Sequence, residues 1–194
     1  RLKALARLDA APPPPPAPDM RFDFPAPEAV APPMITLDQA SVGYRPGQPV
    51  LKGLGLRIDM EDRIALLGAN GNGKTTLLRL FAGALQAEGG HVFRSPRLRV
   101  GYFAQEETEA FDLERTALSH MAALMGKVSD MAVRAHLGRF GLGQEKAELA
   151  IGSLSGGEKA RILIARLMQQ PADLLILDEP TNDLDIPTLE VLEE

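Results

Sequence analysis

The sequence predicts an α/β fold with a mainly parallel core sheet. From residue 34 onward, short apolar segments of strand length alternate with segments of helical pattern. The apolar segments at 62–68 and 174–177 have the length of buried strands, and a glycine loop and a helical segment follow the first of them. Strand–loop–helix units of this kind imply parallel strands. A chain of 194 residues, 45% of them hydrophobic, can bury the core that one such domain needs.

The expected elements follow from local pattern. Segments of strand length lie at 34–44, 50–59, 62–68, 91–93, 98–105 and 174–177. The turn "RPGQP" separates the first two of them, and the turn "EGG" precedes the fourth. A helix is expected at 74–83, where Gly83 is placed to end it. Residues 112–150 are mostly helical in pattern, a helix follows Ser155, and a further helix begins within 181–194.

The charge, the cysteine content and the lengths of the apolar runs argue against several classes of function. The 26 acidic and 21 basic residues give a formal charge of −5, which argues against a general nucleic-acid binder. The local basic cluster of Arg94, Arg97 and Arg99 is explained by a solvated hairpin face. The absence of cysteine excludes disulfides and suits a reducing compartment. No apolar run has the length of a membrane span and no signal peptide is recognisable, so we expect a cytoplasmic protein without a membrane span.

Residues 1–33 differ from the rest of the chain. Ten of the 16 prolines lie here, and the run at 12–16 favours a stiff, extended linker. Before this run, Leu2, Leu5 and Leu8 have the spacing of the last turns of an amphipathic helix, or an accidental spacing in a tail. The sequence alone leaves both alternatives open; the first of them predicts a helix that begins upstream of residue 1.

The segment "GANGNGKTT" predicts a phosphate-binding loop, because it fits G-x-x-x-x-G-K-[ST] between an expected strand and an expected helix. Loop N–H groups can surround phosphates, Lys74 can bring positive charge to the β- and γ-phosphates, and the Thr75 hydroxyl can bind Mg²⁺. The residues expected to bind the nucleotide here are Gly68, Ala69, Asn70, Gly71, Asn72, Gly73, Lys74, Thr75 and Thr76.

Two acids, Asp178 and Glu179, end the apolar strand 174–177. In phosphate-loop ATPases an Asp at this place holds Mg²⁺, and the next acid, Glu179, would orient or deprotonate the attacking water. The alternative is that both acids merely cap the next helix. The matching phosphate loop earlier in the chain makes the catalytic interpretation the stronger one.

Two further residues could complete the site. Gln105 ends the strand "VGYFAQ", where a neutral amide could contact both Mg²⁺ and water; an ordinary loop glutamine is the alternative. Tyr44 closes an expected strand, and its ring could stack on adenine or simply pack in the strand. The residues alone leave both alternatives open; the family resemblance described below favours Gln105 at the metal and the water, and Tyr44 at the base.

The stretch "LSGGEKAR" predicts a second anion site. Ser155 and Glu158 form the Ser-x-x-Glu pattern of a capping box, with Gly156 and Gly157 between them. The N–H groups at such a helix start are unpaired and point outward with the helix dipole. The chain therefore has two expected phosphate-binding elements.

The ordered set of motifs resembles the nucleotide-binding domains of ABC ATPases over residues 34–194. The motifs that carry the resemblance are the A-loop at Tyr44, Walker A at 68–75, the Q-loop at Gln105, the signature at 154–158, Walker B at 174–179 and the D-loop at 182–185. The wording "GGEKAR", "DEPTNDLD" and "GYFAQ" is similar to that of the ABC-F branch. With its proline-rich linker, the chain resembles the second ABC domain of Uup- and YheS-like bacterial members.

The resemblance implies a P-loop NTPase fold of the ABC type, with an N-terminal antiparallel β-subdomain and a helical lobe at about 112–170. It also implies that 1–33 is the end of an interdomain linker. The family's switch histidine and the last strands of the sheet would follow Glu194, so we expect a C-terminally truncated domain.

The resemblance also implies ATP hydrolysis with Mg²⁺ in the intact parent protein. Two ABC domains would associate head to tail, expected on one parent chain, and the signature of each would bind the nucleotide of the other. The residues expected to act in trans are Ser155, Gly156, Gly157 and Glu158. The ABC-F branch implies action on the ribosome or on tRNA; an ATP-binding subunit of a membrane transporter and a non-hydrolysing ATP-gated clamp remain as alternatives.

Overall fold

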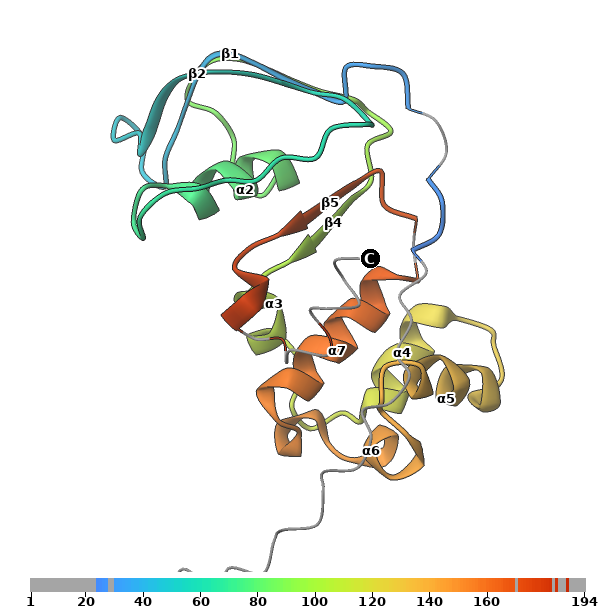
Figure 1. The fold of residues 1–194 in the computed structure, drawn as a ribbon. Helices are drawn as coiled ribbons and strands as arrows, with labels where there is room; N and C mark the ends of the chain where they lie inside the picture. Colours follow the sequence, from blue (N-terminus) through green and yellow to red (C-terminus); the bar gives the residue numbers. More distant parts are fainter. Residues whose placement is uncertain (1–23, 28–29, 170, 183, 185–187, 189–194) are drawn as a thin grey trace, which may run out of the picture.

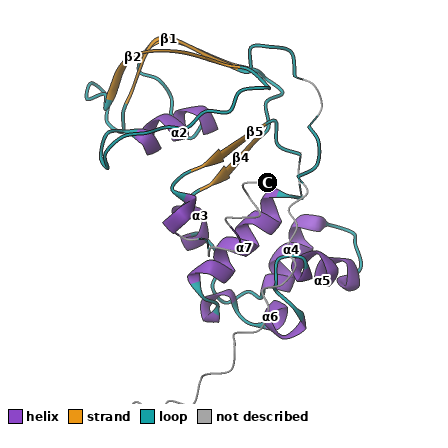
Figure 2. Cartoon of the chain, viewed as in Figure 1, coloured by secondary structure: helices purple, strands orange, loops and turns teal. Residues whose placement is uncertain are grey.

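The computed structural model describes residues 24–27, 30–169, 171–182, 184 and 188 (Figure 1). The strands gather in one half of the molecule, and most of the helices gather in the other (Figure 2). The expected helix end near Leu5 and the proline run lie outside the described residues. So does most of the helix expected within 181–194.

The N-terminal sheet is antiparallel, with the order β2-β1-β3. Its strands are β1 (Ile35–Val42), β2 (Leu51–Ile58) and β3 (Gly89–Arg94). The apolar residues of β1 are buried against helix α2 (Lys74–Ala82), so one face of this sheet forms a core with that helix. The expected antiparallel β-subdomain is therefore confirmed.

A second sheet pairs β4 (Val100–Phe103) in parallel with β5 (Leu174–Leu177). An ion pair stands where both strands begin: Arg99 Nη2 lies 2.9 Å from Asp173 Oδ1, and the Arg99 backbone N–H donates to Asp173 Oδ2 at 2.8 Å. The Asp173 side chain is fully buried, and its hydrogen bonds to Arg99 hold the pKa of the carboxyl below its usual value. The pair stabilises the start of the parallel register.

The strand expected at 62–68 is not formed. Residues 63–69 run without a strand ladder, and Ile64 and Leu67 are 49% and 93% exposed. A cavity of about 690 Å³ separates residues 63–66 from β5. The expectation was wrong for a physical reason: an apolar segment becomes a buried strand only beside a neighbour that pairs with its N–H and C=O groups. Among the described residues no strand pairs with this segment, and the parallel sheet consists of β4 and β5 alone.

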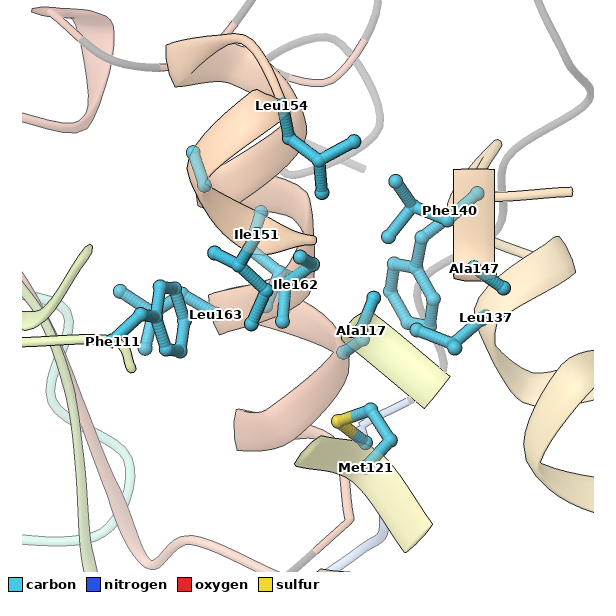
Figure 3. Packing of buried hydrophobic residues seen from close by; sticks show 14 of the residues in the cluster. Phe111, Ala117, Met121, Leu137, Phe140, Ala147, Ile151, Leu154, Ile162 and Leu163 are labelled. Carbon is cyan, nitrogen blue, oxygen red and sulfur yellow. The ribbon is translucent and has the colours of Figure 1, made fainter. Parts of the chain in front are cut away.

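Most of the remaining helices form a lobe with its own core (Figure 3). They are α4 (Ala117–Met125), α5 (Asp130–Gly138), α6 (Gln144–Glu148), the 3-10 turn η1 (Ile151–Ser153) and α7 (Gly156–Leu167). Thr116 and Ser129 cap α4 and α5, since their hydroxyl oxygens accept the N–H groups of Ser119 and Ala132. Burying each large apolar side chain of this core stabilises the lobe by about 1.5–3 kcal/mol.

Helix α3 (Gln105–Glu109) joins the two halves. It follows β4, and Arg166 of α7 lies 3.1 Å from Glu107 on its surface. Arg79 of α2 forms an ion pair with Glu106. The short helix is thus held from the strand half and from the helical lobe at once. No helix in the part of the chain that the structure describes is long and apolar enough to cross a membrane.

Candidate functional site

The glycine loop leads directly into α2. Gly71 and Gly73 have φ of 83° and 84°, a left-handed conformation that side chains disfavour. A Cβ on Gly73 would also lie 2.8 Å from Leu51 Cδ2. No side chain caps α2, so its first N–H groups remain available to an anion. The local geometry is that of a phosphate-binding helix start.

Lys74 lies across the loop that precedes it. Its Nζ donates to the carbonyl oxygens of Gly68 at 2.9 Å and Ala69 at 3.3 Å. The same Nζ lies 3.9 Å from Glu179 Oε1, at the end of β5. The structure therefore brings together the loop lysine and the acid that the sequence predicts as the base.

Glu179 has an unusual backbone. Its φ is 49°, which is uncommon for a residue with a side chain and occurs at functional sites. Asn182 Nδ2 donates to Glu179 Oε2 at 2.9 Å, from the short turn η2 (Pro180–Asn182). The carboxylate is thus held on one side by an amide, with the ammonium of Lys74 near its other oxygen.

Asp178 lies where β4 and β5 end together. Its backbone N–H donates to the carbonyl of Phe103 at 2.8 Å, which extends the parallel ladder by one bond. The Tyr102 hydroxyl donates to Asp178 Oδ2 at 3.1 Å. Burial, with the neighbouring Asp178 carboxylate, raises the pKa of Tyr102 to about 12, so the phenol keeps its proton.

Two cavities meet at these residues. The smaller one, of about 170 Å³, is lined by Thr75, Arg79, Tyr102, Ala104, Glu106, Asp178 and Glu179. The other, of about 370 Å³, is lined by Tyr44, Val50, Asn70, Gly71, Gly73, Lys74, Thr75, Thr76 and Glu179. One cavity therefore joins the phosphate loop to Tyr44, and the other joins it to the two acids.

Tyr44 lies just beyond β1 and is 52% exposed. Its hydroxyl oxygen accepts from Thr76 Oγ1 at 3.3 Å, and the Arg79 guanidinium lies 5.7 Å from the ring centroid. A half-exposed ring beside the phosphate loop is not explained by strand packing, and this supports the interpretation as a base-stacking residue.

The sequence suggested that Gln105 ends a strand, and this expectation was wrong. Strand β4 ends at Phe103, and Gln105 is the first residue of α3. Ala104 lines the cavity that contains Asp178, so the start of α3 is adjacent to the two acids. The role of the glutamine at metal and water stays a prediction.

Ser155 caps α7 as the sequence predicted. The Glu158 N–H donates to Ser155 Oγ at 3.3 Å, and the Ser155 N–H donates to Glu158 Oε2 at 2.8 Å. The start of α7 faces α6, because Lys146 Nζ lies 2.7 Å from Glu158 Oε1. None of the residues lining the cavities at Lys74 comes from α7. The structure thus does not bring the two expected phosphate-binding elements together.

We expect Glu158→Gln to lower the free energy of unfolding by about 1 kcal/mol at pH 7. The hydrogen bond from Lys146, with those from Ser155, lowers the pKa of Glu158 from 4.5 to about 2. A lowered folded-state pKa contributes stability above pH 4.5, and this contribution disappears as the pH falls toward 2. Urea unfolding of the protein that carries this chain should therefore show a smaller difference from wild type at pH 4 than at pH 7. Glu145→Gln is the control, and an equal difference at both pH values would contradict the assignment.

An open β/α arrangement with a glycine loop, a loop lysine and two acids at the end of a neighbouring strand defines a phosphate-loop nucleotide-binding domain. The model of the ABC transporter family matches residues 51–182. The chain belongs to this family, whose domains are ATP-binding.

Curated relatives agree with this placement. The chain is 40% identical to "Protein GCN20" of Saccharomyces cerevisiae over 100% of this chain and 26% of that protein. It is 40% identical to "ABC transporter F family member 3" of Arabidopsis thaliana over 99% of this chain and 27% of that protein. It is 38% identical to "Probable ATP-binding protein YheS" of Haemophilus influenzae over 100% of this chain and 31% of that protein. The resemblance to the ABC-F branch is confirmed, and the chain spans only about a quarter to a third of these relatives.

Solved structures agree with the fold. The dimeric ATP-binding cassette MJ0796, in a post-hydrolysis state bound to ADP and Pi, has a TM-score of 0.67 at 22% identity. That match covers 82% of this chain and 80% of the cassette. A bacterial Atm1-family ABC exporter with ATP bound has a TM-score of 0.67 at 25% identity, covering 88% of this chain and 33% of the exporter. The expected P-loop fold of the ABC type is therefore confirmed.

Proposed function

We propose that the protein carrying this chain hydrolyses ATP, and that this chain supplies one nucleotide site with Mg²⁺. The observation that carries the proposal is the placement of Lys74 and Glu179 at one cavity with the phosphate loop, 3.9 Å apart. A loop cation beside a carboxylate at a strand end suits phosphoryl transfer to water, which depends mainly on positioning and charge neutralisation.

The donors present fit Mg²⁺. Thr75 and Asp178 line the same 170 Å³ cavity and offer a hydroxyl and a carboxylate, which are oxygen ligands. Among the described residues no group of three or more His, Cys, Asp or Glu could hold a metal by itself. This suits Mg²⁺, which binds one or two protein groups and completes its shell with phosphates and water. When bound, Mg²⁺ supplies charge neutralisation at the phosphates.

Each residue then has a separate task. The loop N–H groups and Lys74 bind the phosphates, and Tyr44 offers its exposed face to the base. Glu179, held by Asn182, orients the attacking water and accepts its proton. Gln105, at the start of α3, is proposed to contact the metal and the water. Motion of α3 would then change these contacts when the helical lobe moves.

We further propose that Ser155, Gly156, Gly157 and Glu158 bind the nucleotide of a second ABC domain. Two observations support this: the start of α7 is a capped helix end with exposed residues, and it lies apart from the cavities at Lys74. Head-to-tail association of two cassettes would bring each signature to the other's nucleotide. Loss of the γ-phosphate would then release the two halves.

Ser155→Arg tests this arrangement. In the protein that carries this chain, made hydrolysis-deficient by Glu179→Gln, we expect the variant to stop retaining ATP on a desalting column. The bulky cation would block closure on the partner's nucleotide. Binding at this chain's own loop should be unchanged, measured as azido-ATP cross-linking mapped to the Tyr44 peptide.

Ser129→Arg is the matched control, because Ser129 is also an exposed N-cap serine of the helical lobe. Retention of ATP should persist in this control. Loss of cross-linking at the Tyr44 peptide in Ser155→Arg would instead place the signature at this chain's own nucleotide, contrary to the proposal.

The wider role proposed is a cytoplasmic ABC-F ATPase that acts on the ribosome or on its tRNA. The support is the wording of the motifs, the proline-rich segment before residue 34 and the F-family names among the relatives. The ATP-binding subunit of a membrane transporter is the alternative. A second Walker A and signature upstream on the same chain would favour the first role; a membrane domain would favour the second.

A further inference from the structure

Tyr102 lines one cavity with Asp178, the proposed Mg²⁺ ligand, and with the cationic side chain of Arg79. It belongs to β4, and its hydroxyl donates to Asp178 Oδ2 at 3.1 Å. The side chain is half-buried against the core of the strand half and lines the 170 Å³ cavity with Thr75 and Asp178. None of the roles assigned above uses this hydroxyl.

Arg79 lies near the hydroxyl, because its side chain lines the same 170 Å³ cavity as Tyr102 and Asp178. A guanidinium only donates hydrogen bonds, so it offers no acceptor for the phenol proton. The phenol proton is donated to the carboxylate of Asp178, whose oxygens accept. The bond between Tyr102 and Asp178 thus has a fixed direction.

Arg79 is itself held in place on two sides. It forms an ion pair with Glu106 of α3, and it lies 5.7 Å from the centroid of the Tyr44 ring. Arg79 thus contacts the Tyr44 ring and also lines the cavity of Tyr102 and Asp178. A residue that only filled space in the core would not need a hydroxyl that donates to a carboxylate.

We propose that Tyr102 is a positioning residue, whose hydroxyl orients the Asp178 carboxylate for Mg²⁺ beside the nucleotide. The proposal rests on the proposed function, because it needs a nucleotide–metal site at Thr75 and Asp178. Hydrogen bonds to an ionised carboxylate are stronger than neutral ones, and a fixed carboxylate loses less conformational freedom when it binds a cation.

Tyr102→Phe tests the proposal, because it keeps the ring and removes the hydroxyl. Cross-linking of azido-ADP, mapped to the Tyr44 peptide of the intact protein, measures nucleotide binding at this site. In EDTA we expect the affinity of the variant for azido-ADP to equal that of the wild type. With increasing Mg²⁺ we expect the half-saturating metal concentration to rise about tenfold, as for the loss of one hydrogen bond to a charged group.

Two comparisons separate positioning from general damage. Ser119→Ala also removes one hydroxyl, but that hydroxyl donates to the Thr116 carbonyl in the helical lobe, so the half-saturating Mg²⁺ concentration should stay at the wild-type value. In an Asp178→Asn background, Tyr102→Phe should have no further effect on the Mg²⁺ dependence, because the two changes remove the same interaction.

Three results would overturn the assignment: an unchanged Mg²⁺ dependence in Tyr102→Phe, an equal loss of affinity with and without Mg²⁺, or full additivity with Asp178→Asn. A wild-type protein whose nucleotide binding ignores Mg²⁺ would contradict the proposed metal site itself, and is distinguishable from these.

Discussion

Replacing Lys74 with alanine is expected to remove nucleotide binding at this site. Lys74 begins α2 and already lies over the loop, with its Nζ bound to the carbonyls of Gly68 and Ala69. We expect the same ammonium to face phosphate oxygens when a triphosphate is bound. The loss of such charge-assisted hydrogen bonds costs about 3 kcal/mol, or roughly 100-fold in affinity. Azido-ATP cross-linking mapped to the Tyr44 peptide measures this at one site, even when a second cassette is present.

Lys127→Ala provides the control for this experiment. Lys127 is an exposed lysine that follows α4 in the helical lobe, so its removal changes the net charge equally. We expect its cross-linking to match wild type. Micromolar binding retained by Lys74→Ala would contradict the assignment of the phosphate loop.

Glu179→Gln is expected to slow ATP hydrolysis while sparing ATP binding. The amide keeps the size of the side chain but cannot accept the proton of the attacking water. General-base catalysis contributes about 10²–10⁴-fold, which sets the expected loss in single-turnover hydrolysis at this site. Because the γ-phosphate then remains, ATP should be retained and the closed form should accumulate.

The same variant tests the proposed biological role. Co-sedimentation with ribosomes in the presence of ATP should increase for Glu179→Gln, because the closed form persists. Glu61→Gln, at an exposed acid in the turn after β2, should behave as wild type. Unchanged hydrolysis in Glu179→Gln would contradict its role as the base, and unchanged cellular function would instead favour the non-hydrolysing clamp.

Local pattern predicted those parts of the fold that local interactions determine. The glycine loop, the end of α2 at Gly83 and the capping box at Ser155 all appear where the sequence suggested, since each depends on residues adjacent in the chain. The strand expected at 62–68 failed because its pairing depends on a distant neighbour. Apolar content alone does not reveal whether another strand lies beside the segment, and among the residues that the structure describes none does.

In the candidate site, too, local motifs predicted some residues, and contacts between distant parts of the chain revealed the others. The sequence pointed to Lys74, Asp178 and Glu179 from motifs, and the structure brings them together. Arg79 and Tyr102 were missed, because their importance comes from contacts between α2, β4 and β5. One signal was available: Tyr102 lies near the end of a strand that precedes the expected metal site, and strand ends in parallel sheets meet at one edge.

The parallel pair β4–β5 is fastened at both ends by side chains. Arg99 and Asp173 join the beginnings of the strands, and Tyr102 and Asp178 join their ends. A slip of β5 by a single residue would displace the acid by about 3.3 Å and turn its side chain to the opposite face. The register of β5 thus determines where Asp178 lies. A substitution at Asp173, far from the phosphate loop, would therefore displace the expected metal ligand.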